Sequence, residues 1–191
     1  MSNDTKWWDK WNTDFKREKL KESFDVLDSF LTSAPKNILD IGCGLAYESE
    51  MFQKKYNSNL YLLDGDFEDT KNNQRDVGFG NASSMKFYNP ISRLKESFDK
   101  RGMKYTFIDA NNIEIPENVK FDLVYSNLSC GFHYPVNTYY NLLKTHTTDN
   151  SILIFDIKDS ESVEDQFEII ERKSAYKGQK KIQKTRIKIK Q

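Results

Sequence analysis

The sequence predicts an α/β fold built on a doubly wound, mostly parallel sheet. Between roughly residues 35 and 158, short apolar runs of strand length alternate with segments whose apolar residues have helical spacing. Apolar runs separated by helices are typical of parallel strands buried on both faces and joined by right-handed crossovers. The last two runs have no room for a helix between them, so the sheet should end in an antiparallel hairpin.

Length and charge suit one domain of ordinary size. The chain has 191 residues, and its 29 basic residues balance its 29 acidic ones, so no overall field draws it toward nucleic acid or a membrane. No apolar run reaches the roughly 18 residues of a membrane helix, and the first residues lack the apolar core of a signal peptide. We therefore expect a cytoplasmic protein without a membrane partner.

An N-terminal helical cap, residues 1–34, is expected to precede the main domain, residues 35–191. Apolar side chains recur at helical spacing from residue 8 to residue 32, which predicts one or two amphipathic helices that end at Pro35. In the main domain the parallel strands are expected at 37–41, 60–63, 105–108, 123–125 and 152–155. Helices are expected at 46–56, 90–101 and 135–146, the second with Asn89 as its N-cap and Pro90 in its first turn.

The closing hairpin is expected within residues 167–190 and completes a seven-stranded sheet. In its last strand, Thr185, Ile187 and Ile189 alternate with basic residues, so one face should lie on the core and the other in water. Nine Lys or Arg and no acid lie between residues 172 and 190. Such a stripe could follow a phosphate backbone, but lysines on the wet face of an edge hairpin are the favoured explanation.

The most specific motif in the sequence is a strand followed by a Gly-x-Gly turn and then by a helix. Gly42 and Gly44 lack the Cβ atoms that would block a ligand, and the following helix offers free N–H groups. About 20 residues later Asp64 ends the second strand, where an acid can bind ribose hydroxyls. Turn and acid together predict a nucleoside-bearing cofactor, and Tyr47, in place of a third glycine, argues against NAD or FAD.

Four segments resemble the class I S-adenosylmethionine (SAM) dependent methyltransferases. They are LDIGCGLA, the strand that ends at Asp64, YTFIDA, and FDLVYSN from Phe121 to Asn127. The basic hairpin is similar to the closing strand pair of that family. The resemblance implies the class I fold, SAM as cofactor and S-adenosylhomocysteine (SAH) as product. Ala46 replaces the frequent third glycine of the family motif, which leaves open only the local turn geometry.

The resemblance also implies the cofactor site, with the glycine turn around the methionine part, Asp64 at the ribose and Asp109 at the adenine. The cofactor-binding residues expected on this basis are Asp40, Gly42, Cys43, Gly44, Asp64, Gly65, Asp109, Ala110, Ser126 and Asn127. Alternatives remain open. A buried Asp40 needs a partner, either backbone N–H groups or the ammonium of the cofactor, and Asp64 and Asp109 could be loop acids that cap helices.

Residues 126–135 follow the fourth strand, where a methyl acceptor should lie. His133, with Tyr134 beside it, is the catalytic candidate, because a hydroxyl nucleophile benefits from a base whose pKa is near neutral. A hydrogen bond from His133 to the backbone at a helix start is an equal alternative. The segment lacks the Asn-Pro-Pro-aromatic motif of enzymes that methylate DNA amino groups, and Cys130 follows Ser129 rather than a proline, so it is expected to be a packing residue.

Residues 65–89 form a connection much longer than the usual strand-to-helix loop and are expected to be a substrate lid, with a partly disordered loop as the alternative. Side chains of the lid, the cap and the fourth-strand segment are the expected substrate contacts: Trp8, Trp11, Arg75, Phe87, Tyr88 and Phe132. Helix packing is the alternative for the tryptophans. No acidic cluster has metal-ligand spacing, and Cys43 and Cys130 are too few for a disulfide framework, so neither a metal nor a disulfide is expected.

The sequence thus predicts a SAM-dependent methyltransferase that methylates a hydroxyl group of a small molecule. A sugar or glycan precursor is the expected acceptor, because the FHYP segment resembles short sugar O-methyltransferases. Two alternatives stay open: an RNA methyltransferase that uses the basic hairpin, and a catalytically silent SAM-binding partner subunit. A monomer or a homodimer is expected.

Overall fold

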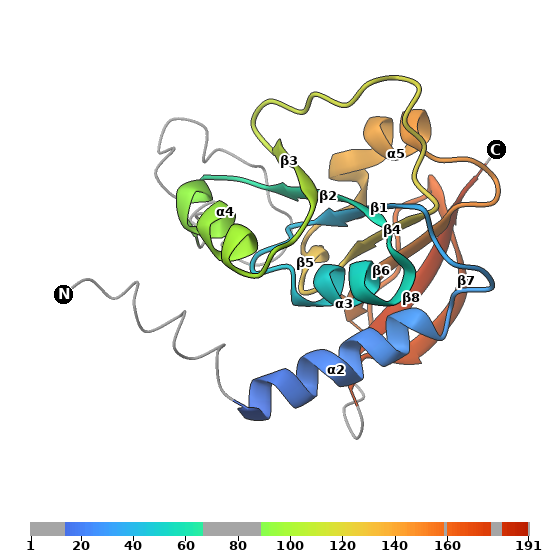
Figure 1. The fold of residues 1–191 in the computed structure, drawn as a ribbon. Helices are drawn as coiled ribbons and strands as arrows, with labels where there is room; N and C mark the ends of the chain where they lie inside the picture. Colours follow the sequence, from blue (N-terminus) through green and yellow to red (C-terminus); the bar gives the residue numbers. More distant parts are fainter. Residues whose placement is uncertain (1–13, 67–88, 159, 177–180, 191) are drawn as a thin grey trace.

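The structure is a computed structural model and describes residues 14–66, 89–158, 160–176 and 181–190. Its seven-stranded sheet has the order β3-β2-β1-β4-β6-β8-β7 (Figure 1). The strands are β1 Asn37–Ile41, β2 Asn59–Asp64, β3 Tyr105–Asp109, β4 Leu123–Ser126, β6 Ile152–Lys158, β7 Phe167–Ser174 and β8 Ile182–Ile189. The first five pair in parallel and the last two are antiparallel, which confirms the predicted fold class.

Helices cover both faces of the sheet. The helices are α2 Asp14–Asp28, α3 Tyr47–Tyr56, α4 Ile91–Lys100, the 3-10 helix η2 Val136–Tyr139 and α5 Tyr140–His146. Helices α2, α3 and α4 lie on one side of the sheet and α5 on the other (Figure 1). Phe24, Phe52 and Phe98 belong to one core cluster, and Val136 and Leu143 belong to a second one. Because both faces are covered, the central strands are buried along nearly their whole length and consist mostly of apolar residues. Among the described residues, no helix combines the length and apolarity needed to cross a bilayer.

Two helix boundaries differ from the prediction. Helix α2 ends at Asp28, well before Pro35, because the chain tightens into a turn in which Leu31 N–H donates to the Asp28 carbonyl at 3.0 Å. Pro90 is the N-cap of α4 rather than a residue of its first turn, since its ψ of 134° is extended. The predicted stretch before residue 14 lies outside the described residues.

One strand was not predicted. β5, Ser129–Tyr134, lies outside the main sheet and packs against β6, with Gly131 beside Phe155 and the Asp156 carbonyl. The chain reaches it because Leu128 adopts a left-handed conformation, with φ of 49°, directly after β4. The segment predicted to face the methyl acceptor is therefore a strand that packs against β6.

The hairpin confirms the predicted alternation only in part. Thr185 and Ile187 are buried and Lys188 is exposed, as expected. Lys184 is an exception, because it is fully buried and forms an ion pair with Asp156 across the β6–β8 pair. The prediction that the basic residues of this hairpin face water is therefore wrong for Lys184.

Candidate functional site

The glycine turn after β1 lies at the carboxyl edge of the sheet and is tied to the neighbouring strand. Gly42 N–H and Cys43 N–H both donate to the Leu63 carbonyl, at 2.8 and 3.1 Å. Positive φ angles at Gly42, Gly44 and Ala46 turn the chain into α3. The turn thus places the first N–H groups of α3 at the edge where ligands bind in open α/β sheets.

The two glycines have different neighbours. A Cβ on Gly42 would lie 2.0 Å from Ser129 Oγ and 2.5 Å from Ser129 Cβ, so this glycine makes room for the start of β5. Among the described residues, a Cβ on Gly44 would meet no atom within 4 Å. The open space beside the turn, where a ligand could approach the backbone, therefore lies at Gly44.

Asp64 joins the glycine turn to the end of β2. Its Oδ2 accepts the Gly44 N–H and its Oδ1 accepts the Gly65 N–H, both at 2.8 Å. Asp109 lies directly beside it in the β2–β3 register and accepts the Asn111 N–H at 2.8 Å. The structure therefore brings these two predicted acids together at one edge, and in both cases the carboxylate holds a turn.

A cavity of about 480 Å³ opens beside Ala110, just beyond Asp109. Ala110 N–H donates to the Asp64 carbonyl at 2.8 Å, which fixes the chain where β3 ends. Apolar side chains that include Ile113, Ile115 and Leu142 line the cavity. Its lining also includes Thr145 and His146, and the His146 carbonyl accepts the Phe121 N–H just before β4 begins, so the cavity runs along α5 away from the carboxyl edge.

Asp40 lies in a buried network of hydroxyl groups beneath the turn. Its Oδ2 accepts the hydroxyls of Ser49 and Tyr125, each at 2.8 Å, and those two hydroxyls are 2.6 Å apart. Burial raises the pKa of Asp40 to about 7, and the charges of Glu48 and Asp64 raise it too, against the effect of the two hydrogen bonds. In the described part of the chain the hydrogen-bond partners of Asp40 are therefore hydroxyl groups rather than backbone N–H groups.

Carboxylates are concentrated around the turn. Besides Asp40 and Asp64, Glu48 of α3 is buried, and burial raises its pKa while the nearby charge of Lys184 lowers it. The raised pKa values favour the protonated, uncharged form of both buried carboxyl groups, Asp40 and Glu48.

The chain after β4 is held by Ser126 and Asn127. Ser126 Oγ donates to the Ile41 carbonyl at 2.7 Å and accepts the Cys130 N–H at 2.8 Å, which ties β1, β4 and β5 together. Asn127 Oδ1 accepts a hydrogen bond from Lys184 Nζ at 2.6 Å. Both cysteines are buried thiols, as expected.

Tyr134 and His133 point to different surroundings. Tyr134 Oη lies 3.0 Å from Ser129 Oγ and 3.8 Å from where a Gly42 Cβ would be, so it borders the glycine turn. His133 is half-buried against the ring of Phe132, with ring centroids 4.8 Å apart. Burial lowers the pKa of His133, and the charge of Lys158 lowers it further, which favours the neutral imidazole at pH 7.

Several predicted substrate contacts lie outside the described residues. They are Trp8, Trp11, Arg75, Phe87 and Tyr88. The same holds for most of the predicted lid, of which the structure describes only Gly65, Asp66 and Asn89. Phe132 is described and lies beside the Lys158 ammonium, 5.6 Å from its ring centroid.

Three residues of the site were missed from the sequence: Ser129, Asp156 and Lys184. Asp156 could have been found, because it directly follows the apolar run 152–155, just as Asp64 follows its own strand. Ser129 and Lys184 carry no such signal. A buried lysine and an exposed one look the same in a sequence of alternating basic residues.

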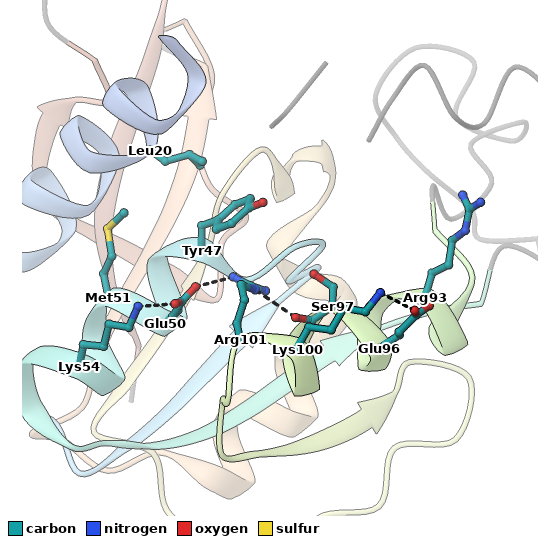
Figure 2. Close-up of a pocket in the computed structure, with 10 residues that line it drawn as sticks. All are labelled: Leu20, Tyr47, Glu50, Met51, Lys54, Arg93, Glu96, Ser97, Lys100 and Arg101. Carbon is teal, nitrogen blue, oxygen red and sulfur yellow. Dashed lines mark hydrogen bonds and ion pairs between the residues drawn. The ribbon is translucent and has the colours of Figure 1, made fainter. Parts of the chain in front are cut away.

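A groove of about 700 Å³ lies elsewhere, between α2, α3 and α4 (Figure 2). Arg101 stands in its wall, where it donates to the Leu45 carbonyl and to Glu50, and its guanidinium lies 4.6 Å from the Tyr47 ring centroid. Two further ion pairs, Lys54–Glu50 and Lys100–Glu96, lie along the groove (Figure 2). Arg101 therefore stabilises the chain directly after the glycine turn, through its hydrogen bond to the Leu45 carbonyl. No group of metal-ligating side chains occurs among the described residues.

No protein-family model matches the sequence, and neither does any curated protein. Solved structures match it in fold. A SAM dependent methyltransferase from Aquifex aeolicus has a TM-score of 0.64 at 14% identity, over 98% of this chain and 99% of that one. The PH0226 protein from Pyrococcus horikoshii OT3 has a TM-score of 0.61 at 13% identity, over 94% and 93%.

The plantazolicin methyltransferase BpumL, in complex with a triazolic desmethylPZN analog and SAH, has a TM-score of 0.52 at 19% identity. The match covers 81% of this chain and 52% of BpumL, so the chain spans about half the length of that enzyme. A ribosomal protein L11 methylase from Lactobacillus delbrueckii subsp. bulgaricus matches with a TM-score of 0.55 at 13% identity, over 91% and 80%.

Proposed function

We propose that this chain, which has the fold of the class I SAM-dependent methyltransferases, binds SAM and transfers its methyl group to a small-molecule acceptor. A fold alone does not determine an activity, so the proposal depends on the site. One observation carries it: the Gly44 N–H donates to Asp64 Oδ2, which makes the open glycine turn and the strand-end acid one unit at the ligand-binding edge.

The residues at this edge are arranged as SAM requires. Gly44 borders open space for the methionine part, Asp64 is placed for the ribose, and Asp109, beside Asp64 in the β2–β3 register, is placed for the adenine. When bound, SAM supplies a methyl group activated for in-line displacement.

For the acceptor we propose a hydroxyl group, with a sugar or glycan precursor as the substrate class. The Ser129–Tyr134 hydroxyl pair lies beside the glycine turn and can orient a polar acceptor. The base that the sequence predicts is His133, whose neutral imidazole can accept a proton, although its ring packs on Phe132 and not, like Tyr134, beside the turn. The RNA alternative has less support. Arg172 donates to the Glu161 carbonyl, Lys173 donates to Ser29, and Lys184 is buried, so these cations do not face a phosphate backbone.

Replacing Asp64 with Asn should weaken SAM binding roughly tenfold to a hundredfold, because hydrogen bonds from the ribose hydroxyls to a charged acceptor are lost. Isothermal titration calorimetry with SAM and with SAH measures this. Asp122→Asn is the matched control, because Asp122 also accepts two backbone N–H groups but lies at the opposite edge of the sheet. Failure of the intact protein to bind either ligand would refute the proposal, as would equal losses in both variants.

His133→Gln should lower kcat about a hundredfold or more while SAM affinity stays within about twofold, because the variant loses only a proton acceptor. Release of SAH in the presence of a panel of sugars and sugar phosphates measures turnover. Tyr134→Phe serves as the comparison, since it removes one hydroxyl at the glycine turn and keeps the ring. Unchanged turnover in His133→Gln would remove His133 from the mechanism, and SAM binding without turnover on any acceptor would favour a silent binding subunit.

A further inference from the structure

Lys184 is a fully buried lysine that has no role in the proposed methyl transfer. The side chains of Lys184 and Asp156 are both 0% exposed, and their charged atoms lie 3.0 Å apart. Such a pair is expensive to bury and adds little stability in comparison with apolar side chains of the same size. A role in placing other groups would account for it.

Both members of the pair hold the turn between β4 and β5. Lys184 Nζ donates to Asn127 Oδ1 at 2.6 Å, and Asp156 Oδ2 accepts the Leu128 N–H at 3.0 Å. Leu128 is the residue with the left-handed backbone, so the bond to Asp156 fixes the turn where it is most strained. The ion pair thus determines how the chain leaves β4.

The lysine also determines which end of the Asn127 amide is available to a ligand. An ammonium group can only donate, so the amide oxygen must face Lys184 and the NH₂ group must face away from it. Within the described part of the chain, Lys184 is the only hydrogen-bond partner of the Asn127 side chain. Asn127 is half-buried at the carboxyl end of β4 and therefore presents two N–H donors at the ligand-binding edge.

We propose that Lys184 and Asp156 are positioning residues that turn the Asn127 amide so that its NH₂ group binds the carboxylate of the methionine part of SAM. The inference rests on the proposed function, since it assigns a group of the proposed cofactor. It gives the C-terminal hairpin a part in cofactor recognition.

The strand order supports the carboxylate as the bound group. In the order β2-β1-β4, the ribose acid Asp64 ends β2, the glycine turn follows β1, and Asn127 follows β4. A ligand whose ribose is at Asp64 and which crosses the turn therefore reaches Asn127 with its amino-acid end, about 10 Å away at two strand spacings. At that end the carboxylate accepts hydrogen bonds, whereas an ammonium group cannot use an N–H donor.

The test compares ligands with and without the amino-acid part. Calorimetry is done with SAM, SAH and 5′-methylthioadenosine, which keeps the nucleoside but lacks the carboxylate. Asn127→Asp retains an oxygen for Lys184 and replaces the NH₂ donor with a second acceptor. We expect affinity for SAM and SAH to fall about tenfold or more, and affinity for methylthioadenosine to stay within about twofold. Asn118→Asp, at an exposed position, adds the same charge and should change none of the three.

A second variant tests the ion pair itself. Asp156→Asn with Lys184→Gln removes both buried charges together, which avoids leaving one of them unpaired. The glutamine amide can donate or accept, so Asn127 is no longer oriented, and we expect threefold to tenfold weaker SAH binding with unchanged methylthioadenosine binding. Circular dichroism melting checks that both variants fold.

Each result decides for or against the inference. Equal affinities of intact protein and Asn127→Asp for SAH would overturn it, as would a parallel loss for methylthioadenosine. If the double variant binds SAH as tightly as the intact protein does, Lys184 and Asp156 are not positioning residues for Asn127. If the intact protein binds none of the three ligands, the proposed function fails and the inference fails with it, an outcome distinct from the others.

Discussion

Replacing Gly42 with Ala should destabilise the protein by about 3 kcal/mol and abolish SAM binding. The new Cβ would lie 2.0 Å from Ser129 Oγ, so the start of β5 must move. Overpacking of this kind costs about 1 to 3 kcal/mol, and the left-handed φ of 70° costs alanine about 1 kcal/mol more. Displacement of β5 also moves Tyr134 away from the turn, which is why we expect binding to be lost with stability.

Urea unfolding and calorimetry with SAH measure both effects. Gly44→Ala is the control for stability, because its Cβ would meet no atom within 4 Å and only the cost of its positive φ remains. Adding Ser129→Gly to Gly42→Ala removes both clashing atoms and should restore most of the lost stability. Equal destabilisation by Gly42→Ala and Gly44→Ala would show that β5 does not pack on the turn as described.

The free energy of unfolding should fall as the pH rises from about 4 to about 7, because of Asp40. Its pKa is about 7 in the folded protein against 3.8 for the free side chain, so in this range the unfolded chain has lost a proton that the folded protein retains. Folding binds the proton, and raising the pH therefore favours the unfolded state by an amount on the order of 4 kcal/mol. Below this window both states are protonated, and above it both are ionised, so the effect is constant there.

Urea unfolding at a series of pH values, compared between intact protein and Asp40→Asn, isolates this contribution. The asparagine keeps an oxygen for the hydroxyls of Ser49 and Tyr125 and cannot ionise. The difference in unfolding free energy between the two proteins should therefore change steadily across the window, with the variant less sensitive to pH. Parallel curves would mean that Asp40 is ionised in the folded protein throughout.

The strands were predicted closely because both faces of the sheet are covered. A strand buried on both sides leaves an uninterrupted apolar run, and the five parallel runs appear in the structure within a few residues of their expected bounds. β5 was not predicted because it lacks such an apolar run. It packs against β6 outside the sheet, and its residues, from Ser129 to Tyr134, have no continuous apolar pattern.

Helix boundaries were less accurate, since they depend on local turn geometry. Pro90 was expected within the first turn of its helix, yet its extended ψ makes it the cap. The proline at position 35 indicated that no helix passes it, but the earlier end of α2 follows from a tight turn that buries Phe30. Propensity marks where a helix cannot continue, and packing decides where it stops.

The sequence by itself determined the fold class, the glycine turn and the acids at the strand ends. These features follow from local rules, because parallel strands must bury apolar runs and their carboxyl ends must meet at one edge. Only the tertiary structure decided what each residue touches there. It separated the roles of Gly42 and Gly44, brought Tyr134 rather than His133 to the turn, and buried Lys184 beside Asp156. Those contacts join residues far apart in the chain, and which of them meet depends on strand order and packing, which no local pattern encodes.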